Sequence, residues 1–282
     1  MKIAVINDLS GMGRCSLTAS IPVLNALGQQ VYPVPTAILS NQTGYPKFSF
    51  FDFTDYMDEY IANWVDMGVR FDVIYSGFLS NQKQVQKIKD MHKNMSNDGC
   101  ILVVDPVMGD GGKMYATFDD ELCNQIKNLA READVVTPNV TEACILTDTD
   151  YNEFVSSLNK NNFAVMFLGL AKKVQNLGCK KVVITGYERD EQNQKFVCNF
   201  VLDGDRFDYT QNKMYGGHYS GTGDITASII AGQLANGKSL FTSVQTAVDF
   251  VEVAVKHAFE NNVPQNDGVN FEKFLHLLLK QV

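Results

Sequence analysis

Short apolar runs rich in β-branched residues recur along the chain, and a stretch long enough for a helix separates each from the next. Six of these runs predict buried strands, at 3–6, 31–34, 73–75, 101–104, 135–136 and 182–185. Five intervening segments are typical of helices, at 54–67, 81–95, 119–131, 152–177 and 239–260. Strands that are apolar throughout, rather than at alternate positions, indicate a mostly parallel sheet with helices on both faces. The pattern therefore predicts an α/β fold in a single domain over residues 1–282.

One segment departs from this alternation. Residues 187–219 are polar and rich in turns, with strand-like pieces at 196–202 and 207–209. The segment directly precedes a glycine-rich turn, where a flap over a bound ligand would be useful. The pattern fits a flap or a plain surface hairpin.

The glycine-rich turn is Gly221-Thr222-Gly223-Asp224, followed at once by an apolar run over 225–231 that can form a helix. Two glycines let the backbone approach a ligand closely. The N–H groups at the start of the helix would bind an anion without a basic side chain. Asp224 would repel a phosphate there, but it suits a base that takes a proton from a hydroxyl attacking phosphorus. The alternative is a solvated aspartate near a helix start.

Polar or glycine residues follow every predicted strand. Ligands of open parallel sheets bind at the carboxyl ends of the strands, so these residues predict one shared site. In chain order they include Asn7, Ser10, Thr36, Gln42, Ser76, Gly77, Asp105, Asp110, Asn139, Glu142, Thr185 and Gly186, with Phe78 directly after Gly77.

Carboxylates at these strand ends point to Mg²⁺. Asp105 and Asp110 follow the same strand, as suits an ion that keeps several waters, although a turn-capping aspartate and a solvated one would look the same. Glu142 lies three residues after Asn139, which predicts a capping box at a helix start. Glu142 could also hold a metal-bound water. We favour both roles because Asp110 and Asp224 need a shared cation nearby.

The pattern G-x-x-x-x-G-K-S, typical of a P-loop, occurs at residues 232–239. A P-loop follows a strand and opens a helix, whereas 225–235 has the pattern of the body of a helix. Gly237 is placed to cap its end, and Ser239 to cap the next helix. We therefore predict a helix boundary here.

Composition excludes several classes of partner. A net charge of −8 argues against nucleic acid, which favours a basic face. The six cysteines form no C-x-x-C pair, which indicates reduced thiols and no zinc site. The first apolar run is too short for a signal peptide, and no stretch approaches the roughly 20 apolar residues of a membrane span. The sequence predicts a cytoplasmic protein.

Five segments together resemble the pyridoxal kinases of vitamin B6 salvage, within the ribokinase superfamily. They are Ser-Asn-Gln-Thr-Gly-Tyr at 40–45, Ser-Gly-Phe-Leu at 76–79, Asp-Pro-Val-Met-Gly-Asp at 105–110, Thr-Pro-Asn-Val-Thr-Glu at 137–142 and Gly-Thr-Gly-Asp at 221–224. The resemblance implies a ribokinase-like three-layer sandwich that phosphorylates the 5′-hydroxymethyl group of pyridoxal, pyridoxamine or pyridoxine with ATP. It also implies Mg²⁺ and a homodimer, and it leaves a monovalent cation open.

The resemblance also implies roles for particular residues. Asp224 would be the catalytic base, and the amides of 221–223 the anion hole. Asp110 and Glu142 would belong to the Mg²⁺ and phosphate region. The expected ATP-binding residues are Asp110, Asn139, Glu142, Thr185 and Gly186, and the expected substrate-binding residues are Asn7, Ser10, Thr36, Gln42 and Phe78.

The chain departs from the pyridoxal kinase pattern near the substrate. Asn7-Asp8 stands where many of these kinases carry Ser-His, Gln42 where a His is common, and Phe78 where a Tyr is usual. The Asp-x-Ser-Gly start also resembles the hydroxymethylpyrimidine kinases of thiamine synthesis. Those kinases, and a non-catalytic B6-binding protein, are the alternative functions. Sugar and nucleoside kinases fit less well, and retention of Asp224, Asp110 and Glu142 argues against a protein that only binds.

Overall fold

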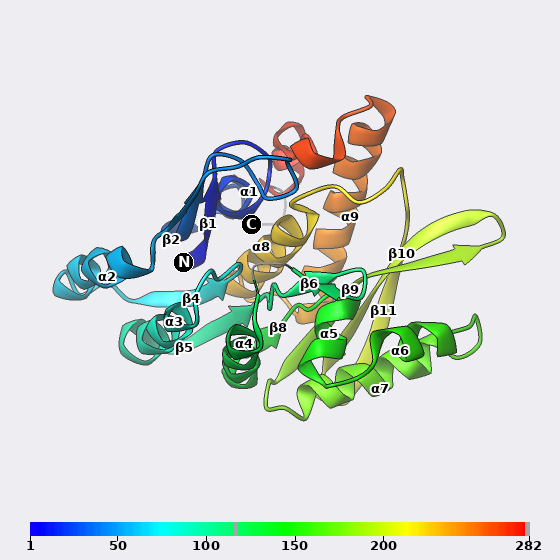
Figure 1. Cartoon of the computed structure of the whole chain (residues 1–282), viewed down its shortest axis with the longest axis horizontal. Helices are drawn as coiled ribbons and strands as arrows, with labels where there is room; N and C mark the ends of the chain where they lie inside the picture. Colours follow the sequence, from blue (N-terminus) through cyan, green and yellow to red (C-terminus); the bar gives the residue numbers. More distant parts are fainter. Residues whose placement is uncertain (116–117, 280–282) are drawn as a thin grey trace.

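A nine-stranded, mostly parallel sheet runs through the protein (Figure 1). The computed structural model describes residues 1–115 and 118–279. The strands are β1 (Lys2–Ser10), β2 (Gln30–Leu39), β3 (Phe50–Asp52), β4 (Phe71–Ser76), β5 (Ser96–Val104), β8 (Val135–Val136), β9 (Lys181–Glu191), β10 (Gln194–Asp203) and β11 (Arg206–Lys213). Their order is β11-β10-β9-β8-β5-β4-β1-β2-β3. All six predicted strands are confirmed.

The central strands from β9 to β2 pair in parallel, and antiparallel strands close both edges of the sheet. The segment 187–219, for which a flap or hairpin is expected, contains the end of β9 and all of β10 and β11. The β9–β10 turn has Gln192 and Asn193 at positive φ. This hairpin projects beyond the helices (Figure 1). Its closure over a ligand stays a prediction.

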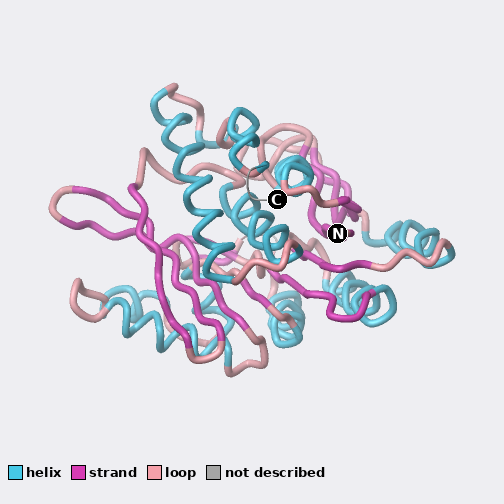
Figure 2. Tube along the Cα trace, turned by 180° about the vertical axis from the view of Figure 1, so that it is seen from behind, coloured by secondary structure: helices cyan, strands magenta, loops and turns pink. Residues whose placement is uncertain are grey.

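Helices cover both faces of the sheet, as expected (Figures 1 and 2). One face packs against α2 (Met57–Asp66), α3 (Gln82–Met95), α4 (Asp120–Glu132), α5 (Val140–Leu146), α6 (Tyr151–Ser157) and α7 (Phe163–Gln175). The other face packs against α1 (Ser16–Ala26), α8 (Thr222–Ala235) and α9 (Leu240–Glu260). Successive side chains of β1 alternate between the two cores, because Ile3 and Val5 join one and Ala4 and Ile6 the other.

Short 3-10 helices complete the chain, at Thr54–Tyr56 (η1), Gln265–Asp267 (η2) and Phe271–Leu277 (η3). A small hairpin, β6 (Gly109–Asp110) with β7 (Lys113–Met114), stands apart from the main sheet.

The helix predicted over 152–177 was wrong as a single element, since α6 and α7 divide it. The side chain of Asn159 accepts hydrogen bonds from the N–H groups of Asn161 and Asn162, at 2.9 and 3.2 Å. This local turn competes with the helical hydrogen bonds and ends the first helix.

The P-loop pattern is a helix boundary, as predicted. Gly237 follows α8 at φ +73° and donates its N–H to the carbonyl of Leu234 at 2.9 Å. Ser239 then caps α9 by accepting the N–H of Thr242 at 3.2 Å.

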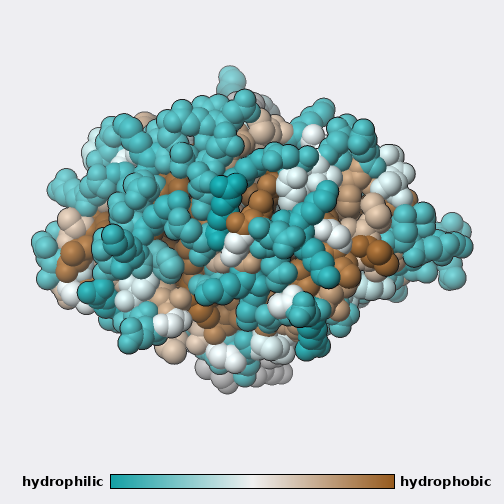
Figure 3. Space-filling view, turned by 90° about the horizontal axis from the view of Figure 1, so that it is seen from below, coloured by the Kyte–Doolittle hydropathy of each residue, from teal (hydrophilic) through white to brown (hydrophobic). Residues whose placement is uncertain are grey.

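The face seen from below is mostly hydrophilic, with apolar residues scattered across it (Figure 3). Within residues 1–115 and 118–279, no helix has the length and apolar character needed to cross a membrane.

Phe167 on α7 stacks on Phe200 of β10, with ring centroids 3.8 Å apart and an interplanar angle of 8°. Both side chains are fully buried. We expect Phe167→Ala to lower the free energy of unfolding by about 3–5 kcal/mol, because it leaves a cavity between helix and sheet. Urea denaturation measures this. Val165→Ala, on the exposed side of α7, is the control and should change stability by less than about 0.5 kcal/mol. Equal effects of the two variants would contradict this packing.

Candidate active site

A cavity of about 900 Å³ lies at the carboxyl ends of the parallel strands. Twelve of the predicted site residues line it, namely Ser10, Gln42, Phe78, Asp110, Asn139, Glu142, Thr185, Gly186, Gly221, Thr222, Gly223 and Asp224. The strand ends therefore form one site, as the sequence predicts. Among the described residues, the cavity lining does not include Asn7 or Thr36, which are fully buried.

Glycine at position 221 is required by the local geometry. Gly221 caps α8 with φ +80°, in the left-handed region. A Cβ at this position would lie 1.9 Å from the carbonyl oxygen of Arg14. The turn is thus packed against the residues that lead into α1. The residues of the first turn of α8, whose N–H groups have no intrahelical partner, line the cavity. This is the geometry of an anion site at a helix N-terminus.

Asp224 is held by two donors, one for each carboxylate oxygen. The Nδ2 group of Asn7 donates to Oδ1 at 2.9 Å, and the backbone N–H of Ser16 donates to Oδ2 at 2.8 Å. Ser16 begins α1 with φ +50°, which is strained for a residue with a side chain. Backbone strain at this position is consistent with a site that must point an N–H group at Asp224.

Burial raises the pKa of Asp224 to about 6, and the nearby negative charge of Asp8 adds to the effect. The hydrogen bonds from Ser16 and Asn7 act in the opposite direction. A carboxyl group with a pKa in this range can accept a proton at neutral pH more readily than an exposed aspartate can.

Three more carboxyl groups lie in the cavity wall with less than a tenth of their surface exposed: Asp8, Asp105 and Glu142. Burial, together with the negative charge of Asp224, raises the pKa of Asp105 to about 8. Burial also raises the pKa values of Asp8 and Glu142. Such a cluster favours a bound cation, because a cation offsets the cost of burying several like charges.

Glu142 has the predicted capping role. Its two oxygens accept the N–H groups of Asn139 at 2.8 Å and of Met108 at 3.1 Å. Asn139 completes the capping box by accepting the N–H of Glu142 at 2.9 Å. Asn139 also donates to the carbonyl of Gly109 at 2.8 Å, which ties α5 to the small hairpin β6–β7.

Asp110 ends β6 with an exposed side chain at the cavity. Among the described residues, no three His, Cys, Asp or Glu side chains group closely enough to enclose a metal ion. A site with so few protein ligands suits Mg²⁺, since this ion binds through one or two carboxylates and completes its shell with waters and phosphate oxygens. Asp110 has the position for direct ligation, whereas Glu142, with each oxygen already bonded, fits contact through a water.

Asn7 and Thr36 act on the cavity through Phe78. Asn7 Oδ1 accepts the N–H of Phe78 at 3.0 Å, and the Thr36 hydroxyl donates to the carbonyl of Phe78 at 2.9 Å. The backbone of Phe78 is thus fixed from both β1 and β2. Both predicted substrate residues thus contact the backbone of a residue that lines the cavity.

The loop after β2 lies over the same side of the site and is bonded to η2. Gln42 donates to the carbonyl of Asn266 at 3.1 Å, and Asn266 donates to the carbonyl of Gly44 at 2.9 Å. Tyr45 donates its hydroxyl to Asp267. These contacts join residues 42–45 to a segment more than 200 positions away.

Two features of the site were missed from the sequence. Asp8 lines the cavity and accepts the hydroxyl of Ser10 at 2.8 Å. Its place directly after a predicted strand was the available signal. The second is an apolar wall formed by Val197, Met214, Tyr215, Val248, Val251 and Val255. Three of these residues lie on α9, Val197 lies on β10, and Met214 and Tyr215 follow β11. Only the fold brings them together, so no local motif marks the wall.

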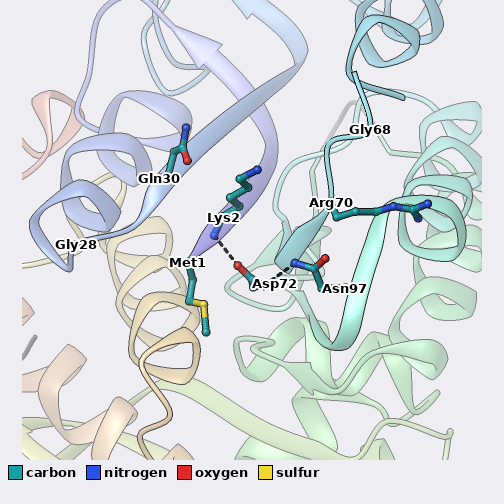
Figure 4. A pocket seen from close by; sticks show the side chains of 8 residues that line it. All are labelled: Met1, Lys2, Gly28, Gln30, Gly68, Arg70, Asp72 and Asn97. Atoms are coloured by element: carbon teal, nitrogen blue, oxygen red, sulfur yellow. Dashed lines mark hydrogen bonds between the residues drawn. The ribbon is translucent and has the colours of Figure 1, made fainter. Parts of the chain in front are cut away.

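A smaller hollow of about 300 Å³ lies at the opposite edge of the sheet, where β1, β4 and β5 begin (Figure 4). Asp72 occupies its centre and accepts the N–H of Lys2 and the amide of Asn97, both at 2.7 Å. Asp72 therefore joins the starts of β1 and β5. It is separate from the predicted strand-end residues.

Comparison with known proteins agrees with this geometry. Residues 11–269 match the family model of phosphomethylpyrimidine kinase. The chain belongs to the phosphomethylpyrimidine kinase family. The family match covers the glycine-rich turn at 221–224 and the cavity-lining residues from Cys15 to Asn266, but not Asp8 and Ser10 at the end of β1.

Solved structures of the family share the whole fold. A Bacteroides thetaiotaomicron protein, described as a phosphomethylpyrimidine kinase and crystallised with pyridoxal, is 37% identical with a TM-score of 0.89, covering 98% of this chain and 95% of that one. Pyridoxal kinase from Lactobacillus plantarum is 28% identical with a TM-score of 0.85, covering 99% of this chain and 96% of that one. The expected likeness to pyridoxal kinases is confirmed.

One curated relative is named as a kinase of the pyrimidine. The hydroxymethylpyrimidine/phosphomethylpyrimidine kinase of Haemophilus influenzae is 30% identical over 59% of this chain and 58% of its own length. The chain spans the same share, 58%, of a curated relative from Schizosaccharomyces pombe. The family therefore includes kinases named for pyridoxal and for the pyrimidine.

We expect Gly221→Ala to lower the free energy of unfolding by about 1–3 kcal/mol or more, since it forces a side chain into the left-handed region and against a carbonyl. Chemical denaturation of the free protein measures this. Gly223→Ala is the matched control, because a Cβ there meets nothing within 4 Å. Its stability should be unchanged or slightly higher, given the greater helix propensity of alanine. Equal losses in both variants would contradict the packing described for Gly221.

Proposed function

We propose that the protein transfers the γ-phosphoryl group of ATP to the 5′-hydroxymethyl group of a B6 vitamer, with Asp224 as the general base. The observation that carries the proposal is the position of Asp224. Its carboxylate lies in the first turn of α8, beside helix N–H groups that can hold a phosphate. Burial raises its pKa to about 6, which suits proton transfer near neutrality.

Phosphoryl transfer depends on positioning and on neutralisation of charge more than on covalent chemistry. The amides of Gly221, Thr222 and Gly223 would form the anion hole, a preorganised set of donors. Asn139, Thr185 and Gly186 would contact ATP phosphates from neighbouring strand ends. Mg²⁺, held by Asp110 and through water by Glu142, would neutralise charge on the phosphates.

The acceptor side of the cavity supports an aromatic heterocycle. Phe78 offers an aromatic ring to the cavity. Its backbone is held by hydrogen bonds at both the N–H and the carbonyl. Ser10 and Gln42 line the same cavity with polar groups that can bind ring substituents. Pyridoxal in the structure of the 37% identical Bacteroides protein supports a B6 vitamer as the substrate class.

Hydroxymethylpyrimidine is the second candidate substrate, and one observation favours it. Asp8 and Ser10, from the Asp-x-Ser-Gly start, are joined by a 2.8 Å hydrogen bond at the cavity wall. A carboxyl group there can accept a hydrogen bond from an amino substituent such as the pyrimidine carries. The Haemophilus relative bears the corresponding name.

Four further expectations stay proposals: a homodimer, a cytoplasmic location, a monovalent cation at the site and closure of the 187–219 segment. The buried carboxyl groups support a cation, since an additional positive charge would lower the cost of their ionisation.

We expect Mg²⁺-dependent ATP consumption with pyridoxal, pyridoxamine or pyridoxine, and a loss of about 10²–10⁴-fold in turnover in Asp224→Ala, the usual contribution of a positioned base. A coupled assay over the three vitamers and hydroxymethylpyrimidine measures this. Asp249→Ala, an exposed aspartate of α9, is the control and should keep full activity. Preference for the pyrimidine would establish the second candidate. Binding of a vitamer without turnover would support the non-catalytic alternative.

The rate should depend on the ionisation of Asp224. A base must be unprotonated to accept a proton, so kcat/KM should fall about tenfold for each pH unit below about pH 6. Above this pH the carboxylate is ionised, and the acid-side loss should disappear. Profiles with two vitamers separate ionisation of the enzyme from that of the substrate. A kcat/KM that stays level down to pH 5 would exclude Asp224 as the base.

A further inference from the structure

The side chain of Asn7 joins the carboxylate of Asp224 to backbone N–H groups at the ends of β1 and β4. Among the described residues, Asn7 is not part of the cavity lining. Its side chain is fully buried at the end of β1. The amide nitrogen donates to Asp224 Oδ1 at 2.9 Å, and the amide oxygen accepts the N–H groups of Asp8 and Phe78, both at 3.0 Å. Every contact of this amide is therefore to the protein itself.

These partners fix the orientation of the Asn7 amide. Two backbone N–H groups can bond only to an acceptor, so the oxygen must face Asp8 and Phe78. The nitrogen then faces Asp224, which can only accept when it is ionised. A flipped amide would place two donors against N–H groups and two acceptors against each other. The arrangement has a single satisfied state.

Gly77 leaves the space that Asn7 occupies. A Cβ at position 77 would lie 2.5 Å from Nδ2 of Asn7 and 2.7 Å from its Cγ. Gly77 does not have a positive φ, so its backbone would accept alanine without strain. The constraint at position 77 is steric and acts on the Asn7 amide.

We propose that Asn7 is a positioning residue that holds the Asp224 carboxylate in place, and that glycine at 77 is required because it leaves room for the Asn7 amide. The effect on catalysis rests on the proposed function of Asp224 as the base. The positioning itself rests on the contacts alone. The sequence had predicted that Asn7 binds substrate, which makes a different kinetic prediction.

The groups around Asp224 determine whether loss of the Asn7 donor raises or lowers the pKa of Asp224. The titratable groups that interact electrostatically with it are Asp8 on β1, Cys15 before α1, Tyr75 on β4, Asp105 after β5 and Tyr115. All of them are neutral or negative. The donor of Asn7 favours the ionised form of Asp224, so its loss raises the pKa of that carboxyl group.

Gly77→Ala is the decisive variant because it keeps every polar group of the site. We expect kcat to fall by up to about 100-fold, the cost of a displacement of about 1 Å near the reacting atoms. The acid limb of kcat/KM should move up by about one pH unit, while KM for ATP and vitamer changes little. Asn7→Ala should lower kcat and move the acid limb in the same way, and it also removes the acceptor of the Phe78 N–H. Gly169→Ala, at an exposed position of α7 where a Cβ meets nothing within 4 Å, is the matched control.

The double variant Asn7→Ala/Gly77→Ala tests whether the two positions act together. Once the Asn7 amide is gone, the methyl group at 77 has nothing to displace, so the double variant should lose no more activity than Asn7→Ala alone. Losses that multiply, a Gly77→Ala variant that behaves like Gly169→Ala, or a raised vitamer KM with kcat unchanged would each overturn the proposal.

A readout without turnover separates this proposal from the proposed function. The ¹³C carboxyl resonance of Asp224, assigned with Asp224→Asn, reports its titration directly by NMR. The midpoint should lie at higher pH in Asn7→Ala and Gly77→Ala than in the unmodified protein. Equal midpoints would refute the positioning role even in an active enzyme. If the protein turned over no substrate, a shifted midpoint would still support the positioning role.

Discussion

Parallel pairing of the central strands is the constraint on which the rest of the structure depends. Because β9, β8, β5, β4, β1 and β2 all run the same way, every carboxyl end lies at one edge of the sheet. Each connection must cross back over a face, which places helices on both sides and buries the middle of the sheet. The chain then leaves the sheet six times at the same edge. Residues as distant as Asn7 and Asp224 meet there because the topology requires it.

The same convergence has an electrostatic cost. Asp8, Asp105 and Glu142 join Asp224 in a region that water reaches poorly, and burial raises the pKa of each. Without a cation, ionisation of all four carboxyl groups would oppose folding. A site tolerates this cost when the same charges bind a metal ion and take up a proton, and active sites commonly give up stability in this way. The acidic cluster is therefore itself an argument for catalysis over simple binding.

The sequence predicted most of the architecture, because buried parallel strands and amphipathic helices each leave a local pattern. It also identified the turn at Gly221 and the capping box of Glu142, whose partners lie within a few residues. What it did not show are contacts that only the fold creates. The bond between Asn7 and Asp224 spans 217 positions, so no local pattern could indicate it. The apolar wall from β10, β11 and α9 has no motif, and the short edge strand β3 carries too few residues for a periodicity.

The proposed base and the proposed acceptor pocket are held by different kinds of structure in this site. Asp224 is fixed by a strand residue and by the first N–H of a helix, so its position depends on the rigid core. Gln42 belongs to a loop that is held by hydrogen bonds to Asn266 of η2 and, through the N–H of Gln42, to the carbonyl of Met12. Substitutions in such loops can change the shape of the acceptor pocket without moving the base. Asn7 limits this freedom, because its amide oxygen holds Phe78 while its nitrogen holds Asp224. A shift of the Phe78 backbone would therefore also move the Asp224 carboxylate, so the proposed acceptor pocket and the proposed base are coupled through this one amide.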